Sequence, residues 1–265
     1  METLSQCVTD ILRDWILHGH FQAGQRIEEI PLATALAVSR TPVRSALATL
    51  ITEGLIVYQP KNGYVVREFD LRDILLAYEV RATLEGLGCR RAAITGLSET
   101  QRDTLRECLA TGDRILSKGV LDPAEHQPYQ KMNVELHNTL LTASDNPWLE
   151  RFVVQADNIP YASNRIVLWD EPFDVIYRSH GDHHRIVEAV LERDDARAEY
   201  LMREHVYYAG VIFKRNFEHR MTQGASRQSA APLAVSPKTA LDLDRLSTKT
   251  GKRPKGLVPV GPASG

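Results

Sequence analysis

Three of the nine histidines occupy positions from which an imidazole can bind a metal ion. His137, His183 and His205 each lie on the apolar stripe of a different predicted helix, so all three can point into one helical interior. Neutral imidazole is a common ligand for zinc, nickel and similar ions, which makes a shared metal site plausible. The alternative is that each is a core histidine satisfied by one hydrogen bond, the commoner role for an isolated buried histidine.

The remaining histidines are less suited to such a site. His180 lies one helical turn before His183 and would replace it if the helical register differs. The others fall off the apolar stripes, at helix ends or in loops: His18, His20, His126, His184 and His219.

A second group of residues is suited to bind a polyanion. Arg40 and Arg44 are four residues apart at the start of a predicted helix, so both project from one face of its first turns. A recognition helix reads the DNA major groove with its N-terminal residues, and arginine matches the two acceptors of guanine. The alternative is a solvated helix face without a partner.

Neighbouring residues support DNA contact. Ser39 or Thr41 can cap this helix or hold a phosphate at its N-terminus. Lys61, Asn62 and Gly63 form a small, basic loop tip of the kind that touches the DNA backbone or minor groove.

The arginines lie within a predicted series of three helices followed by a β-hairpin. Apolar periodicity predicts helices over residues 4–18, 28–37 and 42–54, with Pro42 in a first turn. Two β-prone runs, 55–58 and 64–66, follow and are joined by a turn-forming stretch. Three helices and a hairpin predict a winged helix-turn-helix domain over residues 1–69.

After Val66 the pattern is helical only. Asp70 caps a long predicted helix that ends at Gly96, and Ser98 with Gln101 forms a capping box for the next. Breaks are predicted at 119–128 and 170–172, and helices over 70–96, 98–117, up to about 143, from about 148, and over 179–192 and 195–217. The fold class is therefore mainly α: a winged helix-turn-helix with a β-hairpin wing, then an all-helical antiparallel bundle over residues 70–221.

Composition sets the remaining bounds. With 265 residues, 43% hydrophobic and 25% charged, the chain has room for one large or two modest domains. No apolar run approaches the roughly 18 residues of a membrane span, and no secretory signal is readable, so we expect a cytoplasmic protein. Three distant cysteines fit neither a disulfide framework nor a thiolate zinc site. Residues 222–265 are rich in Ser, Pro, Gly and Lys and predict a disordered, basic tail.

The front motif closely resembles the GntR superfamily of bacterial transcription regulators. It comprises residues 38–47 (VSRTPVRSAL), Leu50, 53–56 (EGLI) and 62–66 (NGYVV). The rest resembles the FadR-like branch, with its helical, ligand-binding FCD domain, through 79–85 (EVRATLE) and 133–137 (NVELH) among others. The resemblance implies base and phosphate contacts by Arg40 and Arg44, a phosphate contact by Thr41 and a wing tip at Gly63. It also shows a departure, because Ile30 stands where some members have another DNA-contacting arginine.

The resemblance also implies a divalent metal, zinc or nickel, because many FCD domains bind one through an aspartate and three histidines. His137, His183 and His205 fall on the three histidines, and Asn133 stands at the aspartate position. An asparagine can coordinate through its carbonyl oxygen but brings no charge, so the site should depend more on an anionic ligand.

In the family an arginine at the position of Arg81 can face the effector cavity, so Arg81 and nearby Tyr78 are candidate effector-binding residues. The alternative is an Arg81–Glu85 pair on the outside of the helix.

The predicted function is a ligand-responsive, homodimeric repressor that binds double-stranded operator DNA and is released by a small carboxylate from a catabolic pathway. One alternative is a metal-dependent enzyme that uses the histidine cluster; the chain lacks the H-E-x-x-H, G-x-S-x-G, Walker and dinucleotide motifs. The other is a metal-free FadR-type regulator that binds an acyl thioester.

Overall fold

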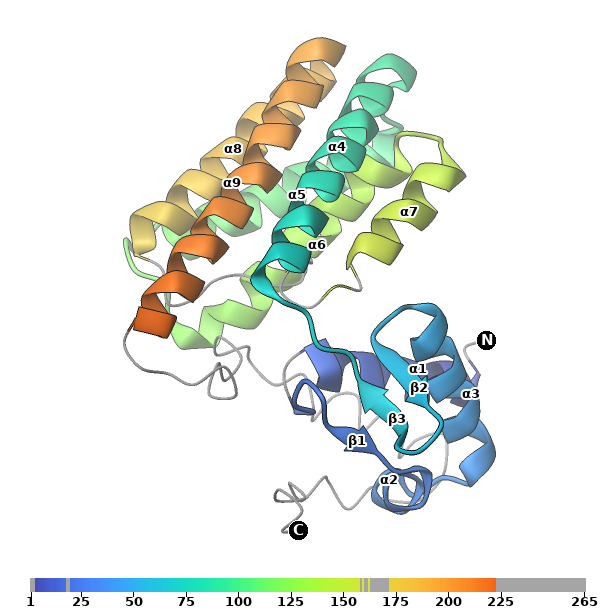
Figure 1. Ribbon diagram of the computed structural model, residues 1–265. Helices are drawn as coiled ribbons and strands as arrows, with labels where there is room; N and C mark the ends of the chain where they lie inside the picture. Colours follow the sequence, from blue (N-terminus) through green and yellow to red (C-terminus); the bar gives the residue numbers. More distant parts are fainter. Residues whose placement is uncertain (1–2, 18–19, 158, 160–161, 163–171, 223–265) are drawn as a thin grey trace. The chain divides into compact units, whose positions relative to one another are not determined.

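The computed structural model describes residues 3–17, 20–157, 159, 162 and 172–222, and it forms two compact units that meet in sequence between Phe69 and Asp70 (Figure 1). Each unit has its own core and is described by itself. The predicted tail after residue 222 lies outside the described residues.

The first unit holds three helices and a small sheet. Its elements are α1 (Leu4–Leu17), β1 (Arg26–Ile27), α2 (Glu29–Leu36), α3 (Arg40–Thr52), β2 (Ile56–Gln59) and β3 (Gly63–Val66). The sheet is antiparallel in the order β1-β3-β2, with Ile27 opposite Tyr64 and Val57 opposite Val65. The sequence predicted only the hairpin, so β1 is an additional strand on its open edge.

The core of this unit comes from the apolar stripes of its helices. Leu12 of α1 and Leu47 and Leu50 of α3 are fully buried, as is Leu55 before the hairpin. Gly54 ends the third helix with a φ of 76°, a backbone conformation that glycine adopts without strain. Because the buried side chains of α1 and α3 pack together, α3 is held in place, and with it Arg40 and Arg44 near its start.

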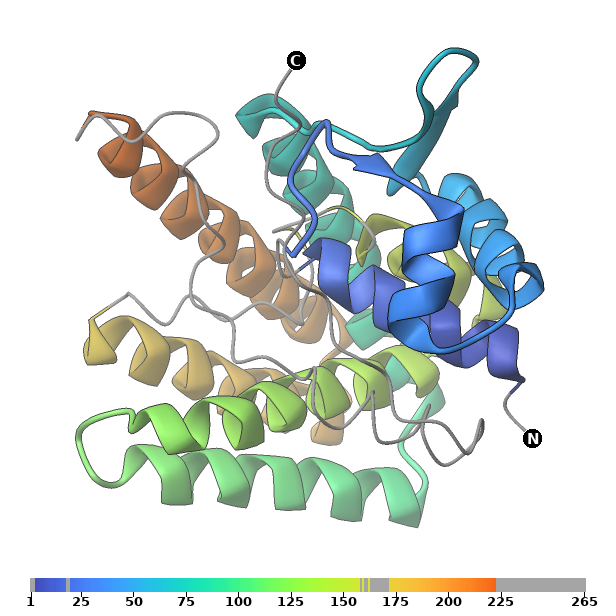
Figure 2. The ribbon, with the colours of Figure 1, turned by 90° about the horizontal axis from the view of Figure 1, so that it is seen from below.

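The second unit is a bundle of α-helices. They are α4 (Leu71–Thr95), α5 (Glu99–Leu116), α6 (His126–Thr142), α7 (Pro147–Asp157), α8 (Phe173–Leu191) and α9 (Asp195–Thr222), with a short 3₁₀ helix over Pro123–Glu125. The predicted caps are present: the Asp70 side chain accepts a hydrogen bond from the Asp73 N–H, and Ser98 and Gln101 form the capping box. Figure 2 shows α5 running alongside α6.

Two glycines let the long helices α4 and α9 approach closely. A Cβ at Gly86 of α4 would lie 3.0 Å from the Glu199 carbonyl oxygen, and one at Gly210 of α9 would lie 2.9 Å from the Tyr78 ring. Both contacts are too tight for a larger residue, so the α4–α9 pair depends on small residues at these points.

Three predicted boundaries in the second unit are wrong. Helix α6 begins at His126, so Pro128 lies within its first turn rather than in a break. Helix α8 begins at Phe173, six residues before the predicted start, immediately after Pro172. Helix α9 continues to Thr222, beyond the predicted end at about residue 217.

Candidate functional site

The three histidines predicted to share an interior lie together there. His137 comes from α6, His183 from α8 and His205 from α9, and one ring nitrogen of each lies within 4.8 Å of the others. Their ring centroids are 5.5 Å apart for His137–His183, 5.3 Å for His137–His205 and 4.7 Å for His183–His205. All three are buried. His183, rather than His180, belongs to this cluster.

His183 differs from an ordinary core histidine. It is completely buried, and neither of its ring nitrogens has a hydrogen-bond partner within the part of the chain that the structure describes. An unsatisfied buried polar group costs about 1–3 kcal/mol. A histidine satisfied by one hydrogen bond, the alternative considered above, therefore does not describe His183.

The electrostatics favour neutral rings at His183 and His205. Burial is the main cause that lowers the pKa of His205 to about 3, and the neighbouring His137 lowers it further. Burial and the surrounding histidines hold the pKa of His183 well below its ordinary value. Neutral rings carry the free lone pairs that a metal ion requires.

Glu85 of α4 orients one of the three rings. Its Oε2 lies 2.6 Å from Nδ1 of His137, while its Oε1 accepts a hydrogen bond from Nη2 of Arg81 at 2.5 Å. A carboxylate on one imidazole nitrogen fixes the tautomer and presents the other nitrogen as a ligand. Burial raises the pKa of Glu85, but Arg81 and His137 outweigh it and hold that pKa below its ordinary value.

Glu85 was missed as a site residue. Glu85 was considered only in the alternative of an Arg81–Glu85 pair on the outside of the helix, yet both side chains are buried, with exposed fractions of 4% and 5%. The available signal was the stripe itself: Tyr78, Arg81, Glu85 and Cys89 recur at helical spacing along the buried side of α4.

The other predicted effector and metal residues line the same interior. Asn133 is buried one turn before His137 on α6. Arg81 also donates from Nη1 to the Ala162 carbonyl, and its guanidinium carbon lies 5.9 Å from the centre of the buried Tyr78 ring.

The predicted DNA-reading residues lie on the exposed start of α3. Arg40 and Arg44 are both more than half exposed, and both donate to Glu29 of α2, with closest distances of 2.8 Å. These hydrogen bonds lower the pKa of Glu29. Sequence analysis overlooked Glu29, which holds the two guanidinium groups side by side.

The flanking residues complete this surface. Ser39 stands at the N-cap position of α3 but its side chain makes no capping hydrogen bond, and Thr41 is exposed in the first turn. In the β2–β3 turn, Asn62 donates to the Gln59 side chain at 2.8 Å. Gly63 has a φ of 72°, and Lys61 is exposed beside it. Ile30, beside Glu29, is exposed.

Comparison with known families accounts for both units. Residues 4–66 match the family of bacterial regulatory proteins called the gntR family, and residues 76–207 match the FCD domain family. The chain belongs to the GntR family and carries an FCD domain. It is a DNA-binding transcriptional regulator, and its family consists of regulators rather than enzymes.

Relatives of this GntR regulator match it over most of both chains. It is 29% identical over 188 residues to the Nta operon transcriptional regulator of Aminobacter aminovorans. The aligned region covers 71% of this chain and 83% of the relative. It is 26% identical over 203 residues to the transcriptional repressor GlaR of Escherichia coli, covering 74% and 89% of the two chains.

Solved structures agree in fold. The E. coli McbR/YncC structure superposes with a TM-score of 0.65 at 20% identity, covering 82% of this chain and all of that one. A GntR regulator from Rhodococcus sp. RHA1 superposes with a TM-score of 0.57 at 22% identity, covering 84% and 99%. Among the described helices of this regulator, none has the length and apolarity to cross a membrane.

Proposed function

We propose that this GntR regulator is a repressor of a catabolic operon, released from its operator when a small carboxylate binds beside a divalent metal in the FCD domain. The observation that carries the proposal is the cluster of three buried histidines from three helices, in which His183 has two ring nitrogens without a protein partner. A ligand that requires lone pairs, such as zinc or nickel, would satisfy the cluster.

The residues present fit such an ion. His137, His183 and His205 would hold it, with the Asn133 amide oxygen as a fourth donor, and it would serve there as a Lewis-acidic anchor for an anion. Glu85 keeps the His137 ring in the tautomer that a ligand needs.

The charge of the site favours a carboxylate effector. Three imidazoles and one amide bring no negative charge, and the nearby carboxylates are already balanced. Glu85 pairs with Arg81, and Asp182, 4.0 Å from Nδ1 of His205, pairs with Arg185. An anionic ligand would supply the missing charge. Tyr78 and Arg81 lie on the side of α4 that faces this interior, so we propose them as effector-binding residues.

DNA binding is assigned to residues 1–69. Arg40 and Arg44 would contact bases and phosphates, Ser39 and Thr41 would contact phosphates, and the wing tip at Lys61, Asn62 and Gly63 would contact the backbone or minor groove. Residues 70–221 would bind the effector and dimerise, and residues 222–265 would form a tail. Since operator DNA lies in the cytoplasm, the proposal places the protein there.

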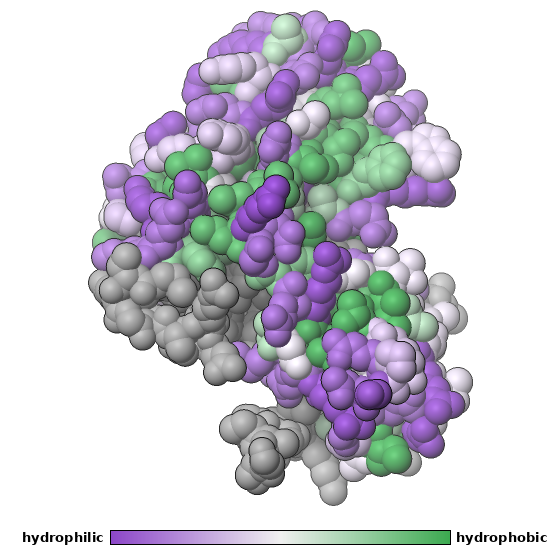
Figure 3. Space-filling view, viewed as in Figure 1, coloured by the Kyte–Doolittle hydropathy of each residue, from purple (hydrophilic) through white to green (hydrophobic). Residues whose placement is uncertain are grey.

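Dimerisation is proposed through the exposed side of α4 and α9. Hydrophobic side chains gather over this part of the helical unit in Figure 3. The exposed apolar and aromatic side chains on these helices include Leu76, Val80 and Leu87 of α4 and Tyr200, Tyr207 and Val211 of α9. A second copy of this side would cover them, as in other two-fold interfaces.

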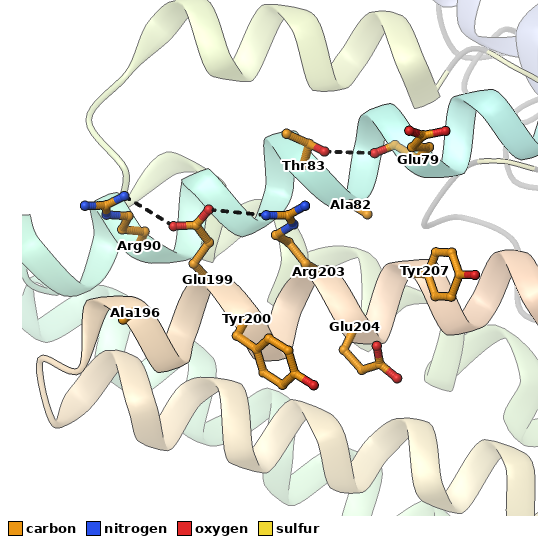
Figure 4. A pocket seen from close by; sticks show the side chains of 10 residues that line it. All are labelled: Glu79, Ala82, Thr83, Arg90, Ala196, Glu199, Tyr200, Arg203, Glu204 and Tyr207. Atoms are coloured by element: carbon orange, nitrogen blue, oxygen red, sulfur yellow. Dashed lines mark hydrogen bonds and ion pairs between the residues drawn. The ribbon is translucent and has the colours of Figure 1, made fainter.

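Between these helices runs an open groove of about 590 Å³ (Figure 4). Arg90 and Arg203 pair with Glu199 along it, so its polar groups are partly satisfied within one chain. Because it is open and lies outside the bundle interior, we assign it to the dimer surface rather than to the effector.

The test uses protein purified without an affinity tag, with metal content measured by mass spectrometry in the wild type and in His183→Ala. We expect about one divalent ion per chain, lost in the variant. A panel of citrate, malate, lactate and gluconate should contain a compound that raises the melting temperature of the wild type only and weakens its operator binding in fluorescence anisotropy.

The absence of metal in both proteins, even after incubation with zinc or nickel, would contradict the proposal. The histidines would then be structural, and the effector would be sought among larger, less polar compounds such as acyl thioesters.

A further inference from the structure

A second group of metal-ligating side chains lies between α5 and α8. Asp113 of α5 presents Oδ1 to two histidines of α8, at 3.1 Å from Nε2 of His180 and 2.9 Å from Nε2 of His184. One ligand atom from each of the three residues lies within 4.8 Å of the others. None of these residues belongs to the His137–His183–His205 cluster.

The arrangement has the spacing of a helical metal site. His180 and His184 are four residues apart, so both rings leave the same face of α8, and their centroids are 5.0 Å apart. Ligands at about 2.0–2.2 Å from a tetrahedral zinc ion lie roughly 3.3 Å from one another. The two nitrogen–oxygen distances are close to that separation.

The fold makes room for one of the rings. A Cβ at Gly112 would lie only 2.1 Å from Cε1 of His180 and 2.6 Å from both ring nitrogens. Glycine inside a helix costs about 1 kcal/mol relative to alanine. Any side chain at position 112 would displace the His180 ring from its place beside Asp113, so the ring's position requires Gly112.

The group combines a fixed ligand with accessible ones. His180 is buried, and its Nε2 is held beside Asp113 of α5. The side chains of His184 and Asp113 are 43% and 57% exposed, so an ion can enter from solvent. Two imidazoles and a carboxylate also supply one negative charge, which the central cluster lacks.

We propose that Asp113, His180 and His184 form a second divalent-metal site, open to solvent and separate from the central cluster. Its ligands suit zinc, nickel or copper(II), and three protein ligands leave a coordination position for water or a further ligand. An ion bound there joins α5 to α8, the helix that also supplies His183. The site stands whether or not the central cluster holds an ion.

The experiment titrates chelator-stripped, tag-free, full-length protein with zinc alone, using isothermal calorimetry and metal analysis after equilibrium dialysis. The variants are His184→Ala and Asp113→Asn at the proposed site, His183→Ala at the central cluster and His126→Ala as a histidine outside both. His184 and Asp113 are partly exposed, so their replacement is expected to leave the fold intact.

We expect the wild type to bind a zinc ion that His184→Ala and Asp113→Asn bind at least tenfold more weakly. His183→Ala and His126→Ala should retain this ion. If the central cluster also binds zinc, the wild type takes up two ions per chain and His184→Ala retains one at the same zinc concentration. If the central cluster does not bind zinc, the wild type takes up one ion and His184→Ala takes up none at that concentration.

Unchanged zinc stoichiometry and affinity in His184→Ala would overturn the proposal, because Asp113 and the histidines would then be only a hydrogen-bonded cluster. Equal weakening by His126→Ala would also overturn it, since the binding would then come from scattered surface histidines.

Discussion

The chemistry of the central cluster depends on which of its groups carry charge. His183 and His205 are held neutral by burial, and Glu85 is the nearest carboxylate, but it contacts His137 and Arg81 rather than the free side of the rings. A cation in this cluster would therefore meet donors without negative charge. Asn133 is the position at which that charge is missing.

Asn133→Asp should tighten zinc or nickel binding by tenfold or more, since a carboxylate adds the missing charge at nearly the same size. The measurement is competition against a chromophoric chelator at fixed pH. The control is Asn138→Asp, an exposed asparagine on the same helix. Equal affinity in Asn133→Asp and the wild type would argue for a structural histidine core.

Glu85→Gln tests the orienting carboxylate. The amide keeps the shape but removes the charge that fixes the His137 tautomer, so metal affinity should fall about 10- to 100-fold. Arg81 would also lose its buried counter-charge, and the melting temperature should drop. Glu79→Gln, exposed on the same helix, is the matched control for both measurements. Metal affinity equal to that of Glu79→Gln would remove Glu85 from the site.

The three central histidines could be predicted from the sequence because helical periodicity places each on an apolar stripe. The role of Glu85 could not be predicted, because an arginine and a glutamate four residues apart give the same sequence pattern whether the pair is buried or exposed to solvent. Its burial is decided by chain segments distant in sequence, such as α6, which supplies His137, and Ala162, whose carbonyl accepts from Arg81.

At the scale of elements, α2 orders the arginine side chains with which α3 would contact DNA. Glu29 accepts hydrogen bonds from both Arg40 and Arg44, and each guanidinium retains donors that Glu29 does not use. DNA phosphates can compete with Glu29 for the same arginines. The α2–α3 pair therefore presents arginines that are already ordered.

Arg44→Ala should abolish specific operator binding, a loss of at least 100-fold, while secondary structure and oligomeric state stay unchanged. The reason is the loss of the base contacts that a bidentate arginine makes. Anisotropy with operator and scrambled DNA measures specificity, and Arg26→Ala, an exposed arginine of the same unit, is the control. Wild-type affinity in Arg44→Ala would show that α3 is not the recognition helix.

Elements with local signals were predicted well. Asp70 and the Ser98–Gln101 box start α4 and α5 through contacts that span three residues, so their sequence pattern suffices. Strand β1 has only two residues and exists because it pairs with β3, about 38 positions later, so no local pattern indicates it. The start of α6 was misplaced because Pro128 was taken as a break, although proline is tolerated in a first helical turn.

At the scale of the whole molecule, the buried histidines make stability depend on pH. In the unfolded chain His183 and His205 regain an ordinary pKa of about 6.5, whereas in the fold the pKa of His205 is about 3 and that of His183 is also lowered. Below pH 6.5 the unfolded state therefore binds protons that the folded state does not. Stability is complete above that pH and falls as the pH decreases.

For the metal-free protein, protonation of the unfolded chain at His205 should cost about 2 kcal/mol of unfolding free energy between pH 7.5 and pH 5, and His183 should add to this cost in the same direction. Glu85 adds little in this window, because its lowered pKa contributes stability that is lost only below its ordinary range. Urea denaturation followed by far-UV circular dichroism measures the slope.

His205→Gln should remove about 2 kcal/mol of that pH dependence, since glutamine stays neutral at every pH used, while His20→Gln, an exposed position, should remove much less. Zinc added at pH 7.5 should raise the unfolding free energy of the wild type, and lowering the pH should release it, because protons and metal compete for the same ring nitrogens. A flat stability profile between pH 7.5 and pH 5 would mean that water or rearrangement reaches the cluster, and that its histidines are not held neutral by the fold.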